Sequence, residues 1–203
     1  MSAPIRLLIA DDEHLIRTAL TALLALEPDI EVVASVGDGA EAIEQARATS
    51  PDVCLLDLEM PEVDGVEAAG RILATVATRV VIVTRHARPG VLRRALAARV
   101  SGFVPKSTPA EDLAHVIRDV AAGKRYIDPE IAATALTAER CPLTDRELDV
   151  LRHSRSTLSV QQIAARMHLA QGTVRNYLSS AMTKLDARSR HEAAEIAWNQ
   201  GWI

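Results

Sequence analysis

An apolar run that stops at an acid is the part of this sequence most suggestive of chemistry. Residues 53–56 read Val-Cys-Leu-Leu and are followed directly by Asp57. A continuous apolar run of this length is typical of a strand buried on both faces, which places Asp57 at the carboxyl end of that strand. In open parallel α/β sheets, ligands bind at that edge. Taken alone, Asp57 fits equally well as a turn residue before Pro61 and Gly65.

Other polar side chains are expected at the same edge. Asp11 and Asp12 follow the first predicted strand, Thr84 ends the fourth and Lys106 follows the fifth. If strands one and three are neighbours, Asp11, Asp12 and Asp57 converge. Three carboxylates repel one another unless a cation lies among them, and an all-oxygen site suits Mg²⁺. With Thr84 and Lys106 they would form a cradle for phosphoryl oxygens, in which Asp57 could act as a nucleophile. The alternatives are that the acids cap the following helix and that Thr84 and Lys106 are ordinary surface residues.

The elements that would position these residues alternate along the first part of the chain. Apolar runs predict strands at residues 5–10, 30–36, 53–56, 80–83 and 102–104. Helical periodicity predicts helices at residues 14–26, 40–47, 66–76 and 91–98, and another that Pro109 opens. This alternation indicates an α/β fold with one doubly wound, five-stranded parallel sheet. We expect the flavodoxin-like strand order 2-1-3-4-5, in which strands one and three are neighbours.

The pattern becomes wholly helical after Cys141 and Pro142. Residues 144–147 and 159–162 are capping boxes, and each predicts the start of a helix. The helix at 159–167 and the next at 173–185 are separated by a short turn, which is typical of a helix-turn-helix. A last helix at 190–199 completes a four-helix bundle. We therefore expect a first domain at residues 1–122, a linker with a short helix at 123–141, and an all-α domain at 142–203.

Composition limits the function classes. The chain has 203 residues, is 48% hydrophobic and carries a net charge of −4. No apolar stretch approaches the ~20 residues needed to cross a bilayer, and residues 1–4 do not begin a signal peptide, so a soluble cytoplasmic protein is expected. Cys54 and Cys141 lack the spacing of zinc ligands or of a disulfide framework. Residues 1–122 carry 12 Lys and Arg against 18 Asp and Glu, whereas residues 142–203 carry 8 against 6. This asymmetry favours two modules with different partners, the second of which could bind a polyanion.

The first module resembles the receiver domain of bacterial two-component response regulators over roughly residues 4–122. The matching residues are Asp11, Asp12, the run Leu56-Asp57 to Met60-Pro61, Gly65, Thr84, and Gly102-Phe103 with Lys106. The resemblance implies that Asp57 accepts a phosphoryl group and that Asp12, Asp57 and the carbonyl of Glu59 bind Mg²⁺, with Asp11 acting mostly from a second layer. It further implies that Lys106 pairs with the phosphoryl group, that Thr84 moves to bond it, and that Phe103 changes rotamer with Thr84. Glu59 and Arg85 would tune the lifetime of the acyl phosphate.

The second module resembles the LuxR-type DNA-binding domain of the NarL/FixJ class. The resemblance lies in Leu143-Thr144, Arg146-Glu147, Val150-Leu151, Ile163-Ala164, Gly172 to Tyr177, Lys184-Leu185 and Ala187-Arg188. Residues 173–180 and 199–203 are most similar to the DesR-like branch of that class. On the exposed face of helix 173–185, Arg175, Asn176 and Ser179 are predicted to read base edges. Contacts to phosphates are assigned to Thr173, Tyr177, Ser180, Lys184 and Arg188.

Three positions depart from the usual pattern of the second module. Helix-ending glycines are replaced by Ser156 or Thr157 and by Asp186, and a left-handed residue other than glycine is costly. Ala170 stands where a capping serine is common, a difference of about 0.5–2 kcal/mol. These departures predict weaker DNA binding on the same fold.

The combined resemblance implies a transcriptional response regulator. A sensor histidine kinase would phosphorylate Asp57, the protein would dimerise, and the homodimer would bind double-stranded DNA. Leu15, Ala19, Ala22 and Leu26 form a second apolar stripe on the first helix, beyond Ile16, Leu20 and Leu23, and could supply the dimer surface. A wide buried face explains that stripe equally well.

Two other functions remain open. One is an Mg²⁺-dependent phosphotransferase or phosphatase, although the sequence shows neither a substrate pocket nor a cap. The other is an unphosphorylated regulator that uses its acidic site only for dimerisation. In the preferred interpretation the protein is not an enzyme, apart from slow loss of its own phosphoryl group.

Overall fold

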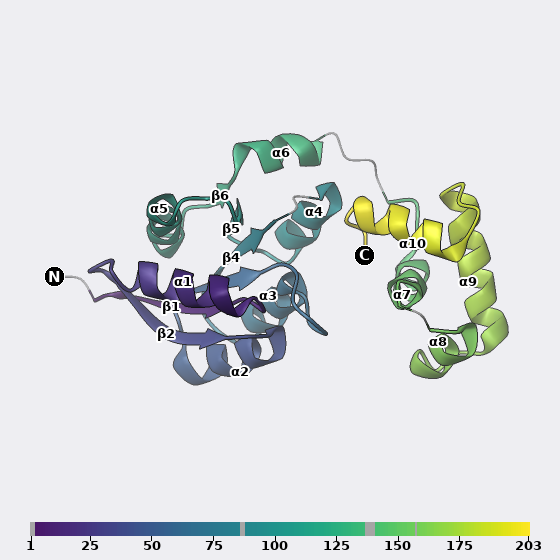
Figure 1. Ribbon diagram of the computed structural model, residues 1–203, viewed down its shortest axis with the longest axis horizontal. Helices are drawn as coiled ribbons and strands as arrows, with labels where there is room; N and C mark the ends of the chain where they lie inside the picture. Colours follow the sequence, from purple (N-terminus) through teal and green to yellow (C-terminus); the bar gives the residue numbers. More distant parts are fainter. Residues whose placement is uncertain (1–2, 86–87, 137–140, 157) are drawn as a thin grey trace. The chain divides into compact units, whose positions relative to one another are not determined.

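The computed structural model describes residues 3–85, 88–136, 141–156 and 158–203. The chain divides into two compact units, one built within residues 1–133 and the other mainly from residues 134–203 (Figure 1). Within the described ranges, no helix is both long and apolar enough to cross a membrane.

The first unit is a parallel sheet flanked by helices. The strands are β1 (Ile5–Ala10), β2 (Ile30–Val36), β3 (Val53–Asp57), β4 (Arg79–Thr84), β5 (Gly102–Pro105) and β6 (Tyr126–Ile127). The intervening helices are α1 (His14–Leu24), α2 (Gly39–Thr49), α3 (Gly65–Leu73), α4 (Pro89–Ala97) and α5 (Ala110–Ala121). The strand order is β2-β1-β3-β4-β5-β6, and every neighbouring pair is parallel. The doubly wound order 2-1-3-4-5 predicted from the sequence is thus confirmed.

The sixth strand is an addition to the predicted sheet of five. Tyr126 pairs with Gly102 and Ile127 with Phe103, and the amide of Asp128 donates to the carbonyl of Phe103 at 2.9 Å. With only two residues, β6 has no apolar run or alternation from which it could be recognised. It lies in the stretch 123–141 that the sequence suggested as a linker.

Side chains of successive strand residues point to opposite faces of the sheet, and this alternation builds the core of the first unit. Leu7, Ile9 and Leu55 pack in one cluster with Leu24 of α1 and Ile117 of α5. Helices α2 and α3 pack against each other and against β1 and β4, on the face opposite α1 and α5 (Figure 1). Because helices cover both faces, β3 is buried along its whole length.

Helix α1 is shorter than predicted, and the buried stripe runs differently. Leu24, four residues after Leu20, is 1% exposed, whereas Leu23, which was expected in the buried stripe, is 47% exposed. Leu15 and Leu26 are 82% and 78% exposed, and Ala19 and Ala22 between them are exposed as well. The alternative of a wide buried face on α1 is therefore wrong for a single chain.

Helix α6 (Pro129–Leu136) begins where the sequence predicted its cap. The side chain of Asp128 accepts hydrogen bonds from the amides of Glu130 and Ile131 at 3.0 and 3.2 Å. Pro129 occupies the first helical position, where its missing N–H group costs nothing.

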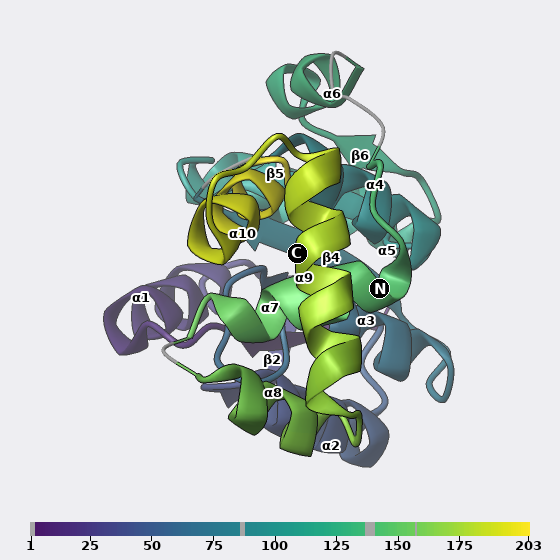
Figure 2. The same cartoon turned by 90° about the vertical axis from the view of Figure 1, so that its right-hand side faces the viewer.

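The second unit is the predicted helical bundle. Its helices are α7 (Asp145–Ser154), α8 (Val160–Arg166), α9 (Gln171–Lys184) and α10 (Arg190–Asn199). Both capping boxes are confirmed, because Thr144 and Ser159 each exchange two hydrogen bonds with the residue three positions later. Helix α9 packs on the other three helices (Figure 2). Its residues Val174 and Leu178 are buried, and Met182 and Leu185 pack against the same core, as the periodicity predicted.

The departures noted at the helix ends have mixed outcomes. Ala170 is the N-cap of α9 and makes no side-chain cap bond. Asp186 follows α9 at a φ of 51°, in the left-handed region that favours glycine. Ser156 is not among the described residues with positive φ, and Thr157 lies outside the described residues.

Candidate functional site

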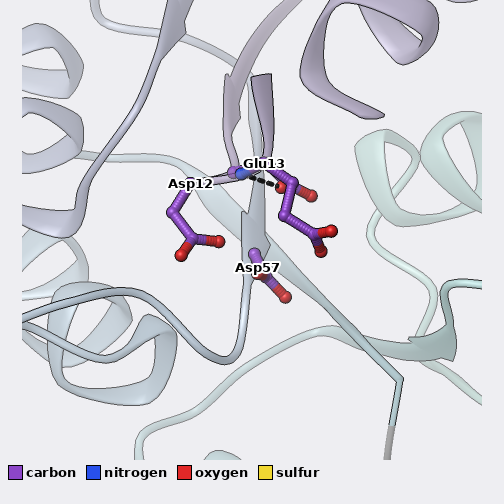
Figure 3. Close-up of side chains that lie close together, drawn as sticks. Asp12, Glu13 and Asp57 are labelled. Carbon is purple, nitrogen blue, oxygen red and sulfur yellow. Dashed lines mark hydrogen bonds between the residues drawn. The ribbon is translucent and has the colours of Figure 1, made fainter. Parts of the chain in front are cut away.

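Acidic side chains gather at the carboxyl edge of the central strands. Asp57 ends β3, and Asp11, Asp12 and Glu13 follow its neighbour β1. Ala10 pairs with Leu56, so the register sets Asp11 beside Asp57. One ligand atom from each of the four carboxylates lies within 4.8 Å of the other three. Figure 3 shows the side chains of Asp12, Glu13 and Asp57 close together at this edge.

Lys106, which follows β5, reaches three of these acids. Its Nζ lies 2.8 Å from Asp11 Oδ2, 2.9 Å from Asp57 Oδ2 and 3.0 Å from Glu13 Oε1. The amide of Lys106 donates to the carbonyl of Thr84 at 2.7 Å, which holds the ends of β4 and β5 together. The structure thereby brings together Asp11, Asp57 and Lys106, as the sequence predicted from the order of the strands.

Burial and pairing act in opposite directions on these groups. Asp11 and Asp57 are 1% and 2% exposed. Burial raises the pKa of Asp57 to about 6, against the opposing hydrogen bond and charge of Lys106. Burial alone would lower the pKa of Lys106, but its hydrogen bonds to Asp11, Asp57 and Glu13 raise it above the usual range. Lys106 is therefore a fixed positive charge against which a carboxylate or a phosphoryl group can be held.

The loop between β3 and α3 passes close to the backbone of Asp57. A Cβ atom on Gly65 would lie 2.1 Å from the carbonyl oxygen of Asp57, so only glycine fits where α3 begins. The amide of Gly65 donates to the carbonyl of Leu58 at 3.0 Å. Glu59 is exposed and, with Asp12, Glu13, Asp57, Arg85 and Lys106, lines a cavity of about 170 Å³. The Asp57 carboxylate thus borders an open polar space.

Thr84 of β4 and Phe103 of β5 are buried residues on adjacent strands. Each is 1% exposed, and Phe103 pairs with Ile82 of β4 while Thr84 pairs with Pro105 of β5. Thr84 adjoins the site, because its carbonyl accepts a hydrogen bond from the amide of Lys106. The roles of Thr84 and Phe103 remain predictions.

Glu13 and Arg85 interact more closely than the sequence indicated. A guanidinium nitrogen of Arg85 donates to Glu13 Oε2, while Glu13 Oε1 accepts from Lys106. The hydrogen bond from Lys106 lowers the pKa of Glu13. In the sequence, only its position beside Asp12 marked Glu13 as a possible site residue. Its partner Arg85 lies 72 residues away, so their pairing follows only from the fold.

The exposed face of α9 presents the residues predicted to contact DNA. Arg175, Asn176 and Ser179 are exposed and lie within little more than one helical turn, as base-reading side chains should. Lys184 and Arg188 are also exposed, whereas Thr173, Tyr177 and Ser180 are partly buried. Tyr177 packs against the bundle core.

Glu147, which the sequence marked as part of a capping box and of the resemblance, is also a buried acid that anchors α9. Glu147 of α7 is 3% exposed and accepts from Ser180 Oγ at 2.6 Å and from Lys184 Nζ at 2.8 Å. Burial would raise the pKa of Glu147, but these bonds and those from Thr144 lower it to about 2. Two of the predicted phosphate contacts, Ser180 and Lys184, are therefore engaged within the second unit.

Comparisons with known proteins agree with both halves of this arrangement. Residues 7–118 match the model of the response regulator receiver domain, and residues 141–197 match that of the bacterial regulatory proteins of the luxR family. The chain is 40% identical to the transcriptional regulatory protein DesR of Bacillus subtilis over 199 residues, which covers 98% of this chain and 99% of that protein. It is 38% identical to the response regulator RamR of Streptomyces coelicolor over the full length of both. The match to a crystal structure of the response regulator ChrA covers 100% of this chain and 100% of that chain, with a TM-score of 0.59 and 27% sequence identity.

The fold, the acidic edge and these matches define the class: a receiver domain joined to a LuxR-type DNA-binding domain. The chain belongs to the two-component response regulators and is a DNA-binding regulator of transcription. Its output is DNA binding, which sets it apart from the phosphatases and phosphotransferases considered from the sequence.

Proposed function

We propose that a sensor histidine kinase phosphorylates Asp57 and that this modification controls dimerisation and promoter binding. The observation that supports it most directly is the pairing of Lys106 with both Asp57 and Asp11 at the mouth of a polar cavity. A phosphoryl group on Asp57 would add roughly −1.5 to −2 charges at this point, and Lys106 is the fixed cation that would hold them. Thr84 would bond the same oxygens, and Phe103 would follow its movement.

The donor set fits Mg²⁺. Several carboxylate oxygens within 4.8 Å, some of them buried, offer the hard oxygen ligands that this ion prefers. Asp12, Asp57 and the carbonyl of Glu59 would hold it, with Asp11 behind them. When bound, the ion supplies positive charge against the oxygens of the transferring group. Asp57 must be ionised to attack phosphorus, and Lys106 favours its ionised form.

Dimerisation is assigned to the exposed apolar residues on α1 and just after its end. The side chains of Leu15, Ala19, Ala22 and Leu26 are exposed in the single chain, and covering them would remove apolar surface from water. Two copies joined in this way would present two α9 helices to two half-sites of double-stranded DNA. A kinase partner and a DNA target imply a cytoplasmic location.

DNA recognition is assigned to α9. Arg175 and Asn176 would read guanine and adenine edges, with Ser179 beside them. Thr173, Tyr177, Ser180, Lys184 and Arg188 would position the helix on phosphates. Lys184 has further donors and can do so while bonded to Glu147, whereas the single O–H donor of Ser180 must first leave Glu147. In this scheme residues 1–122 form the receiver domain and residues 142–203 the DNA-binding domain. Residues 123–141 connect them, although β6 belongs with the sheet. Slow loss of the phosphoryl group to water would be tuned by Glu59 and Arg85.

The test compares wild type with Asp57→Ala after incubation with acetyl phosphate and Mg²⁺. Intact-mass measurement should show one phosphoryl group on wild type and none on the variant, and size-exclusion chromatography should show a dimer only for the labelled protein. Selection from a random pool of double-stranded oligonucleotides should yield a preferred sequence for the labelled wild type. If Asp57→Ala dimerises and binds DNA as well as labelled wild type, the switching scheme is wrong. If wild type takes up no phosphoryl group, the acidic site would serve dimerisation alone.

A further inference from the structure

Glu13 bridges two cations at the mouth of the site. One of its oxygens lies 3.0 Å from Lys106 Nζ, and the other accepts from Arg85. The Glu13 side chain is 35% exposed and that of Arg85 is 51% exposed, so the pair lies at the open side of the cavity. Glu13 is also the N-cap of α1, but its side chain makes no cap bond there. Its carboxylate is free to serve the site without a cost to the helix.

The same cations are those that a phosphoryl group on Asp57 would need. Lys106 Nζ lies 2.9 Å from Asp57 Oδ2, and a phosphoryl group would extend from that carboxylate into the cavity that Glu13, Arg85 and Lys106 line. Glu13 and Asp57 offer oxygens within 4.8 Å of each other. The Glu13 carboxylate therefore borders the space that the phosphoryl oxygens would enter.

We propose that Glu13 is an internal anion that competes with the phosphoryl group on Asp57 for Lys106 and Arg85. The proposal rests on Asp57 being the phosphoacceptor. In the unmodified protein Glu13 bonds both cations, and in the modified protein phosphoryl oxygens replace the Glu13 carboxylate on them. The pair of Glu13 with Arg85 is largely exposed and therefore weak, and a doubly charged phosphoryl group attracts Lys106 and Arg85 more strongly than a single carboxylate does. Glu13 thereby sets how readily the site is loaded, and Arg85 becomes a second phosphoryl-binding side chain beside Lys106.

The chemistry of loading itself is unchanged by this competition. With acetyl phosphate as donor, a bond forms between an Asp57 carboxylate oxygen and phosphorus as the phosphorus–oxygen bond of the donor breaks. Acetate leaves with the electron pair. Release of Arg85 and Lys106 from Glu13 frees two cations to hold the phosphoryl oxygens after transfer.

The first measurement is the equilibrium affinity for beryllofluoride, a phosphoryl mimic, in the presence of Mg²⁺, by calorimetric titration. Glu13→Gln should bind it more tightly by roughly twofold to fivefold, the range for one partly exposed ion pair. Glu44→Gln is the matched control, because it removes an equal charge from an exposed position on α2 and should leave the affinity unchanged. Equal affinity for Glu13→Gln and wild type overturns the proposal.

The second measurement separates competition from simple repulsion of an anion by Glu13. If Glu13 sequesters Arg85, the gain in affinity from Glu13→Gln must be smaller in an Arg85→Gln background, because one of the two cations that Glu13 would release is absent. If Glu13 only repels the ligand, the gain persists in full, and the proposal is overturned. The two single variants, the double variant and wild type complete this cycle.

Labelling with acetyl phosphate distinguishes failure of the proposed function from failure of the role of Glu13. Rates of phosphoryl uptake from intact mass should rise in Glu13→Gln, with a lower half-saturating donor concentration. If wild type is never labelled at Asp57, the proposed function fails. If wild type is labelled but Glu13→Gln is labelled no faster, only the role of Glu13 fails.

Discussion

The carboxylate of Glu147 on α7 accepts a hydrogen bond from Lys184 Nζ on α9 at 2.8 Å, across 37 residues of sequence. A second oxygen of Glu147 accepts from Ser180 at 2.6 Å. The last two turns of α9 are thereby tied to α7, so that the helix expected to enter the DNA groove has a fixed orientation in the bundle. Loss of any one of these donors would leave the buried Glu147 carboxylate with fewer hydrogen bonds, which would lower the stability of the fold.

Replacement of Glu147 by Gln should destabilise the second unit and weaken DNA binding. The amide loses the charge-assisted bond from Lys184, a loss of about 1–3 kcal/mol in the free energy of unfolding. The two tryptophans, Trp198 and Trp202, both lie in the second unit, so their fluorescence during urea unfolding reports on this unit. Asp149→Asn, which breaks an exposed pair with Arg152, is the control and should change stability little. An unchanged unfolding midpoint for Glu147→Gln would show that the bonds to α9 contribute nothing.

Acid should unfold the second unit in a window set by Glu147. Its pKa is about 2 in the folded protein and 4.5 is its ordinary value. Between these values the unfolded chain binds more protons, so stability from this group is fully present above pH 4.5 and is lost as pH falls toward 2. The tryptophan-monitored stability should therefore fall over this range, and more steeply in wild type than in Glu147→Gln. Parallel curves for the two proteins would refute the assignment.

Gly65→Ala should disturb the loop between β3 and α3. The added methyl group would lie 2.1 Å from the carbonyl oxygen of Asp57, and either α3 or the end of β3 must shift. We expect a loss of about 1–3 kcal/mol in stability and impaired phosphoryl uptake from acetyl phosphate. Gly70→Ala is a matched control on the same helix, because a Cβ there has no atom within 4 Å and alanine favours the helix. Uptake as fast in Gly65→Ala as in Gly70→Ala would contradict the need for close approach.

Ala170→Ser should strengthen the start of α9. The N-cap residue now makes no side-chain bond, and a serine hydroxyl could accept from an orphan amide of the first turn. Stability should rise by about 0.5–2 kcal/mol in tryptophan-monitored urea unfolding. Ala170→Gly is the control, because it changes the backbone preference without adding a hydroxyl. An equal gain in stability for Ala170→Gly would assign the effect to backbone conformation and not to the hydroxyl.

Local patterns in the sequence determined most of the elements. The capping boxes at Thr144 and Ser159, the N-cap at Asp128 and the buried run before Asp57 depend on residues within a few positions of one another. Because parallel strands bring their carboxyl ends to one edge, the order of strands also predicted that Asp11, Asp57 and Lys106 would meet.

The tertiary structure alone decided which side chains pair across long distances and which face of a helix is covered. Strand β6 is too short to leave a periodic signal, and its pairing depends on β5 being in place. The burial of Leu24 in place of Leu23 follows from how α1 lies on the sheet. The bonds of Glu13 to Arg85 and of Glu147 to Lys184 join residues that have no local pattern in common. Such pairs form only when packing has fixed the distance between their helices and loops, because a charge has no preferred partner until the fold supplies one.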